Sequence, residues 1–159
     1  MATTLRHEIE ATCPPASVWA LLADLEAVQH YNPTVRTAAI KGVRRTGIGA
    51  ERVCELLPKG RVVERVTHWE DGRTLGLEVA ESDWPIQFMR WVTRLEPKGG
   101  GTRISQTLEY ALKFGPAGWL LDRLLMRRKL SATLDDVFNR LARRAEAGSL
   151  AAGAQPRLV

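Results

Sequence analysis

The sequence predicts a single α+β domain in which a curved antiparallel sheet surrounds a long C-terminal helix. Two observations support this fold class. Apolar and polar residues alternate in seven segments between residues 4 and 112, and beyond Gly115-Pro116 the apolar period changes from two to about 3.6. The 159 residues suffice for one domain with a sizeable core.

One strand and two short helices are predicted at the start of the chain. Thr4–Thr12 alternates as a half-buried strand does, and Pro14-Pro15 ends it. Ala16–Ala23 follows as a short helix, and Asp24 is placed to cap a second one that ends near Tyr31. The strand face that we expect to be buried carries Leu5, His7, Ile9 and Ala11.

Six further strands are predicted, separated by turns that contain glycine, proline or aspartate. Because the connections are short, we expect antiparallel hairpins rather than strand–helix–strand units. The predicted strands are Thr34–Val43, Ala50–Leu57, Arg61–Trp69, Thr74–Glu81, Gln87–Glu96 and Thr102–Leu112.

A long helix is predicted from about Gly115 to Ala145. Its apolar stripe consists of Leu120, Leu121, Leu124, Leu125, Leu130, Leu134, Val137, Phe138 and Leu141. A helix of roughly 30 residues is about 45 Å long, enough to cross the sheet. From Gly148 onward the chain is rich in glycine and alanine, so we predict a folded domain over residues 1–147 and a disordered tail over 148–159.

Charge and cysteine content narrow the classes of partner. The net charge of +5 could indicate a nucleic-acid partner, but the basic residues are dispersed, so we expect no specific nucleic-acid binding. Only Cys13 and Cys54 are present, and no signal peptide is evident, which favours the reducing cytoplasm. The segment Trp119–Leu130 could lie on a membrane surface, but we favour simple packing and expect no stable membrane insertion. Nothing in the sequence fixes the oligomeric state.

Alternation also predicts which polar side chains face the helix. On the inner face we expect His7, Glu64, His68, Gln106 and Tyr110, with Val63 and Trp69 on the opposite face. Burying the Glu64 carboxylate costs free energy unless the group is paired or protonated. Glu64 therefore either contacts the ligand, as a hydrogen-bond partner or acid–base group, or bonds to a neighbouring strand or to the helix as part of the fold. We expect it to matter more to ligand recognition than to stability.

Few catalytic arrangements fit these residues. Glu64 and His68 lie four residues apart in one strand, about 13 Å, which is too far for a direct hydrogen bond. Candidate catalytic residues are therefore Glu64, His7 and His68 without an established pair. The three histidines lack metal-ligand spacing, and Lys98 followed by three glycines lacks the order of a phosphate loop, so we expect no metal and no cofactor.

Several local motifs, taken in order, are similar to one superfamily. Ala11–Asp24 (ATCPPASVWALLAD) is similar to its opening helix, and Tyr31-Asn32-Pro33 stands where many members carry a turn with tryptophan or histidine. Gly47–Arg52, Gly60–Val66 and Gly101–Arg103 are similar to its strand entries. The chain thus resembles the START/Bet v1-like (SRPBCC) superfamily, most closely its polyketide cyclase/dehydrase and lipid-transport branch.

This resemblance implies a helix-grip fold with a ligand cavity between the sheet and the C-terminal helix. The cavity would be lined by Tyr31, Glu64, Met89, Trp91, Ile104, Gln106, Leu108, Tyr110, Leu121 and Leu124. We rank first a non-catalytic carrier, sensor or chaperone for a lipid, isoprenoid or aromatic metabolite. A polyketide cyclase, aromatase or dehydratase is second, and an interaction module is third.

Overall fold

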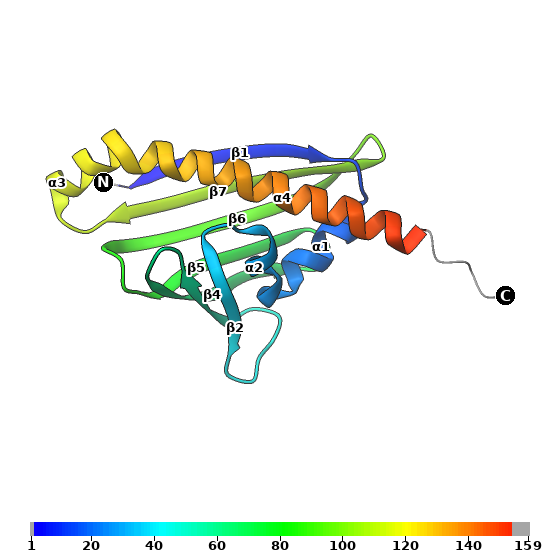
Figure 1. Ribbon diagram of the computed structural model, residues 1–159, viewed down its shortest axis with the longest axis horizontal. Coiled ribbons are helices and arrows are strands. Elements are labelled where there is room, and N and C mark those ends of the chain that lie inside the picture. The colour runs from blue at the N-terminus through cyan, green and yellow to red at the C-terminus, as the bar shows by residue number, and fades with distance from the viewer. Residues whose placement is uncertain (1, 154–159) are drawn as a thin grey trace.

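The computed structural model of the protein describes residues 2–153 and contains one seven-stranded antiparallel sheet (Figure 1). The strands are β1 (Thr3–Ala11), β2 (Val35–Lys41), β3 (Glu51–Leu56), β4 (Arg61–Glu70), β5 (Thr74–Ser82), β6 (Ile86–Lys98) and β7 (Gly101–Leu112). Their order in the sheet is β1-β7-β6-β5-β4-β3-β2. Each strand from β2 to β6 therefore pairs with the strand that follows it in the chain, and β1 pairs with β7. The predicted strands and their antiparallel pairing are confirmed.

Short helices follow β1, and a long helix ends the described chain. They are α1 (Pro15–Ala23), the 3₁₀ turn η1 (Leu25–Ala27), α2 (Val28–Tyr31), α3 (Gly115–Leu121), the π-helical turn η2 (Asp122–Met126) and α4 (Arg127–Gly153). The side chain of Asp24 accepts a hydrogen bond from the backbone N–H of Glu26, as expected for a cap. Together α3, η2 and α4 form a C-terminal helix of 39 residues.

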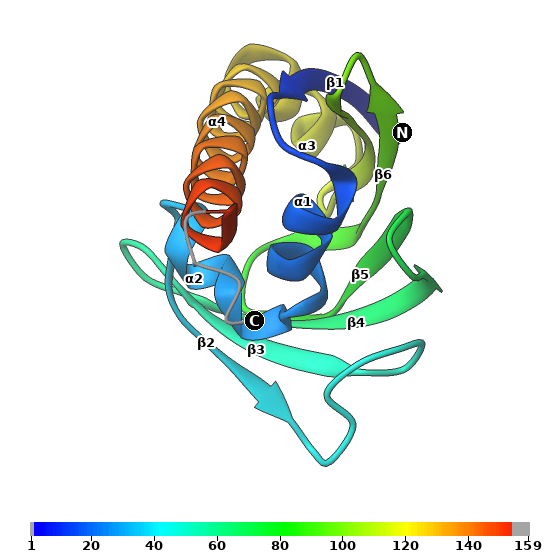
Figure 2. The ribbon, with the colours of Figure 1, turned by 90° about the vertical axis from the view of Figure 1, so that its right-hand side faces the viewer.

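The sheet curves around α1 and α2, with α4 on the open side of the curve (Figure 2). Along its length α4 lies beside β1, and it packs against α1 and α2 at one end of the sheet. The main core lies at this end, where Phe138 and Leu141 of α4 meet Val18 and Leu22 of α1. This arrangement is the predicted sheet-around-helix fold.

The hairpin between β6 and β7 shows why its motif requires glycine. Gly99 and Gly100 form the turn with positive φ, as predicted. A Cβ on Gly101 would collide with the backbone carbonyl of Ala11, where β1 and β7 converge. The Gly-Thr-Arg motif therefore reflects a close backbone approach.

The predicted faces of β4 were wrong beyond Val66. The pairing of β4 with β5 shifts between Val66 and His68, and this bulge reverses the faces beyond it. His68 is therefore exposed, whereas Trp69 packs against the core and Trp19. Of the predicted tail over 148–159, residues 148–153 continue α4, and the rest lies outside the described residues.

Candidate functional site

The middle of the inner sheet face is an apolar wall that the helix covers only in part. β6 contributes Met89 and Trp91, which are half-buried, and β7 contributes the buried Leu108 directly across from Trp91. Ile104 lies four residues further along the same face of β7, across from Leu95. On α4 the half-buried Leu134 and Val137 pack against the same core cluster as Trp91. Three of the predicted ligand-binding residues, Met89, Trp91 and Leu108, are thus neighbours, and Ile104 lies deeper in the core on the same face.

His7 connects β1 to α4. Its Nδ1 lies 3.0 Å from Oδ1 of Asp135, and its ring centre lies 5.0 Å from that of Phe138. A carboxylate beside Nδ1 favours the tautomer that carries its proton there, which leaves Nε2 as an acceptor. Nε2 is buried and makes no hydrogen bond to any described residue. A buried acceptor without a partner costs free energy that a ligand hydroxyl or a water could recover.

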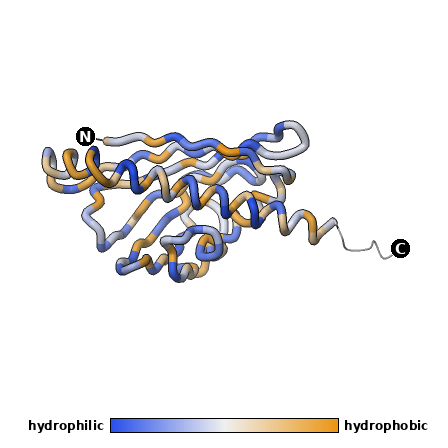
Figure 3. The backbone as a smooth tube through the Cα atoms, turned by 45° about the horizontal axis from the view of Figure 1, so that its top comes forward, coloured by the Kyte–Doolittle hydropathy of each residue, from blue (hydrophilic) through white to orange (hydrophobic). Residues whose placement is uncertain are grey.

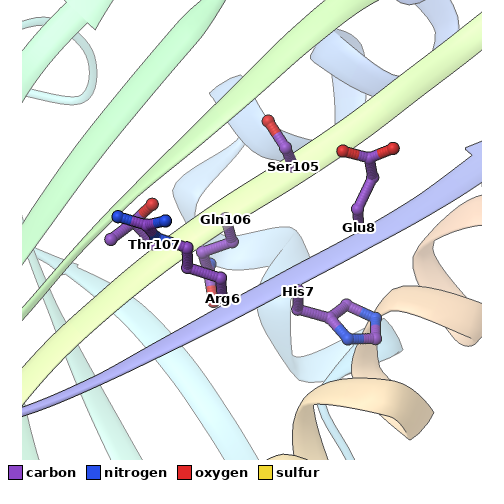
Figure 4. A pocket seen from close by; sticks show the side chains of 6 residues that line it. All are labelled: Arg6, His7, Glu8, Ser105, Gln106 and Thr107. Carbon is purple, nitrogen blue, oxygen red and sulfur yellow. The ribbon is translucent and has the colours of Figure 1, made fainter.

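A cavity of about 200 Å³ lies where β1 and β7 pair, beside His7. Its lining is polar and consists of Arg6, His7, Glu8, Ser105, Gln106 and Thr107 (Figure 4). Two predicted site residues, His7 and Gln106, stand opposite each other in the register and belong to this lining. Gln106 donates a hydrogen bond to Oγ1 of Thr93 over 2.9 Å. Strand alternation puts Arg6, Glu8, Ser105 and Thr107 on the outer face of the sheet, so of this lining only His7 and Gln106 share the inner face with the apolar wall.

Glu64 belongs to a buried polar cluster under α2. Its Oε2 accepts a hydrogen bond from Nε of Arg52 over 2.6 Å, and Arg52 also donates to the carbonyl of Leu25. Only 5% of the Arg52 side chain and 13% of the Glu64 side chain are exposed. Glu64 is therefore paired rather than isolated in an apolar wall, and its contact is a bond to the neighbouring strand.

Two other residues of this cluster are held in their neutral forms. Burial and the nearby Glu64 carboxylate raise the pKa of Cys54 to about 12, so Cys54 is a poor nucleophile at neutral pH. Burial likewise raises the pKa of Tyr31, although the adjacent Arg52 opposes the shift. Tyr31, a predicted ligand contact, is 5% exposed and packs in the core.

A second polar contact fixes the start of the C-terminal helix. Asp122 of η2 accepts hydrogen bonds from the hydroxyls of Tyr110 and Thr3. Burial, followed by the Asp122 carboxylate, raises the pKa of Tyr110. Tyr110 lies on the inner face as predicted, but its hydroxyl is hydrogen-bonded to Asp122 of the C-terminal helix.

Three predicted site residues lie away from this wall. Leu121 and Leu124 of the C-terminal helix are 49% and 62% exposed. His68 is exposed on β4 beyond the bulge. None of the three is enclosed between the sheet and the helix.

Sequence reasoning missed the partners of these polar groups. Arg52 shares a face with Ala50, Cys54 and Leu56, and this pattern was the available signal that it points inward. Asp122 interrupts the run of exposed leucines, and Asp135 precedes Phe138 by one helical turn. For the two aspartates only the tertiary arrangement identifies the partner.

The family described as "Polyketide cyclase / dehydrase and lipid transport" matches residues 2–146. The chain belongs to this family. Its fold, the family's helix-grip, was predicted from the motifs and is confirmed.

Two solved structures illustrate the likeness. TTHA0849 from Thermus thermophilus is 25% identical, with a TM-score of 0.78 over 92% of this chain and 99% of that chain. Ara h 8.0201 is 13% identical, with a TM-score of 0.72 over 92% of this chain and 99% of that chain, which shows the fold alone. No curated protein matches the sequence.

The described residues contain neither a membrane-spanning helix nor a metal-ligand cluster. Among residues 2–153 no helix is long and apolar enough to cross a membrane. Within the same range no three His, Cys, Asp or Glu side chains come together as metal ligands would.

Proposed function

We propose that this family member binds a small hydrophobic ligand between the inner sheet face and α4, as a carrier, sensor or chaperone. One observation carries the proposal. Apolar side chains of the sheet and of the helix, Trp91 on β6 and Leu134 and Val137 on α4, are only half-buried although they border the same core cluster. Covering such surface with an apolar molecule is favourable by about 25 cal/mol per Å². The ligand class that fits is a lipid, an isoprenoid or an aromatic metabolite.

Polar groups beside the wall would orient such a ligand. The unpartnered Nε2 of His7 can accept a hydrogen bond, and Gln106 lies directly across from it on β7. A ligand with one hydroxyl and an apolar body would satisfy both surfaces, the usual composition of small-molecule sites.

Titration with an apolar fluorophore, N-phenylnaphthylamine, tests the site. We expect one-to-one binding with micromolar affinity, about −8 kcal/mol. Trp91→Ala should weaken binding by roughly tenfold or more, because a buried aromatic side chain contributes about 1.5–3 kcal/mol. Leu108→Trp should weaken it by filling the space.

Phe88→Ala is the matched control, since Phe88 lies on the same strand but stacks under Arg90 on the opposite face. If Phe88→Ala weakens binding as much as Trp91→Ala, or if neither inner-wall variant changes it while folded, the proposed site is wrong. Native mass spectrometry of freshly purified protein would then show which molecule, if any, co-purifies.

A second candidate, a polyketide cyclase or dehydratase, is favoured by the His7–Asp135 pair. A carboxylate that orients a histidine and leaves Nε2 available is the arrangement of a general base. If this function is correct, a linear poly-β-ketone thioester should be turned over, and His7→Ala should abolish turnover while fluorophore binding persists. Absence of turnover by the unaltered protein would leave binding as the function.

A further inference from the structure

Apolar side chains are exposed where the C-terminal helix begins. In the segment from Lys113 to Lys129, six large apolar side chains are exposed, from 40% for Trp119 to 71% for Phe114. The set comprises Phe114, Trp119, Leu120, Leu121, Leu124 and Leu125. The segment forms the end of the molecule nearest the N-terminus (Figure 1), and its hydrophobic residues stand out there in Figure 3. Water is an unfavourable environment for so many adjacent apolar side chains.

The exposed charges of the same segment are all positive. They belong to Lys113, Arg123, Arg127, Arg128 and Lys129. The one acidic residue, Asp122, is buried and is bonded to Tyr110 and Thr3. The guanidinium of Arg123 lies 5.5 Å from the ring centre of Trp119, so a cation sits directly beside the exposed indole.

The positive charge of this surface indicates which kind of partner would cover it. A second copy of the same surface would bring two sets of like charges together, which opposes association. A negatively charged surface with an apolar interior would satisfy both the cations and the leucines. Amphipathic helices with basic residues and an apolar face containing tryptophan and leucine lie in the interface of anionic membranes in this way.

We propose that the surface formed by α3, η2 and the first residues of α4 docks reversibly on an anionic lipid surface. Phe114, Trp119 and the four leucines enter the boundary between headgroups and acyl chains, and the five cations contact the headgroups. Docking of this kind is peripheral, consistent with the absence of a spanning helix among residues 2–153. The proposal goes beyond ligand binding and does not depend on it, because vesicles alone provide the test.

Vesicle flotation measures the docking directly. The full chain should float with vesicles that contain phosphatidylglycerol and stay behind with vesicles of phosphatidylcholine alone, and added salt should weaken the binding. Brominated lipids should quench the fluorescence of the protein, and Trp119→Phe should remove most of that quenching.

Removal of the apolar contacts should weaken docking without unfolding the domain. We expect Leu120→Ser with Leu125→Ser to lower the partition coefficient at least tenfold, because both side chains lie in the proposed interface. The matched control is Ile48→Ser with Leu150→Ser, two apolar residues that are 60% and 77% exposed elsewhere. The control should bind as the unaltered protein does, and thermal melting should be alike for both.

Removal of the cations should also weaken docking. Changing Arg127, Arg128 and Lys129 to glutamine should lower the partition coefficient about 100-fold, since each cation near the surface contributes about fivefold. The control changes three exposed cations elsewhere, Lys59, Arg94 and Arg143, to glutamine.

Four results would overturn the proposal. The first is a lack of flotation with anionic vesicles, and the second is equal loss of binding in the matched controls. The third is loss of binding in the cation variant but not in the leucine variant, which would indicate a site for soluble polyanions instead. The fourth is a concentration-dependent dimer that Leu120→Ser with Leu125→Ser dissociates, which would make the surface a contact between two copies of the chain.

Discussion

Two parts of the C-terminal helix have similar apolar patterns but opposite surroundings. Around Leu120–Leu125 the large apolar side chains are exposed, whereas from Phe138 to Ala145 they are buried to 6% exposure or less where they face the core. The second part packs on β1, α1 and α2, and the first contacts mainly the end of β7. Helical periodicity thus identifies an apolar stripe, but the neighbouring elements determine whether the stripe is core.

The largest difference between the two parts should appear on truncation. A chain that ends before Leu130 lacks Phe138 and Leu141, so we expect it not to fold, because α1 and β1 lose their covering. A chain that ends at Ala147 keeps all the buried helix residues and should unfold at nearly the same temperature as the full chain. Circular dichroism melts measure both. Cooperative unfolding of the shorter chain would show that the domain core does not require α4.

Single substitutions in the exposed and buried parts of the helix should differ in the same way. Phe138→Ala should lower the free energy of unfolding by about 3–5 kcal/mol, since it removes a buried aromatic ring that also contacts His7. Leu124→Ala, in the exposed part, should change it by no more than about 0.5 kcal/mol. Urea denaturation of the two variants gives both values. Equal losses would mean that Leu124 is buried in solution.

Glu64→Gln tests the buried ion pair with Arg52, which supports the segment that packs against α4. Arg52 joins Glu64 to the carbonyl of Leu25, and the segment that follows forms α2, which contacts α4. Glutamine cannot neutralise the buried guanidinium, so we expect the free energy of unfolding to fall by about 1–3 kcal/mol.

The affinity of folded Glu64→Gln for the fluorophore, measured alongside, separates the two roles of this residue. An unchanged affinity together with a lower free energy of unfolding would show that Glu64 stabilises the fold and does not contact the ligand. A drop of about tenfold with unchanged stability would restore the ligand-recognition role predicted from the sequence.

The smallest expected effect concerns alkaline pH. The pKa values of Tyr31 and Tyr110 are raised by burial, so both groups resist ionisation more when folded than when unfolded. Their contribution to stability is therefore complete below the unfolded value of about 10 and is lost as pH rises through the folded values. Tyr110→Phe should be slightly less stable at neutral pH, because Asp122 loses a donor, but should lose less stability above pH about 10. Parallel loss in the variant and the unaltered protein would contradict this.

Much of the fold could be predicted from the sequence, whereas much of the candidate site could not. Alternation placed His7, Trp91, Ile104 and Leu108 on the inner face, because a two-residue period needs no knowledge of neighbours. It misplaced His68 because the bulge in β4 leaves no mark in the pattern.

The partners of the buried polar side chains could not be predicted from the sequence. The pairing of Glu64 with Arg52 depends on the register of β3 against β4, and that of His7 with Asp135 depends on where α4 crosses β1. The leucines at the start of the helix were expected to face the sheet, and their exposure follows from the path of the helix rather than from its composition.

The location of a bound apolar molecule is the most direct test of the proposed function. In a two-dimensional NMR titration with N-phenylnaphthylamine, we expect the indole of Trp91 and the methyl groups of Leu134 and Val137 to shift in proportion to saturation. Leu150, at the far end of α4 and 77% exposed, should not shift. Shifts confined to Leu120 and Leu125, with Trp91 unaffected, would place the molecule on the exposed start of the helix and contradict a site between the sheet and α4.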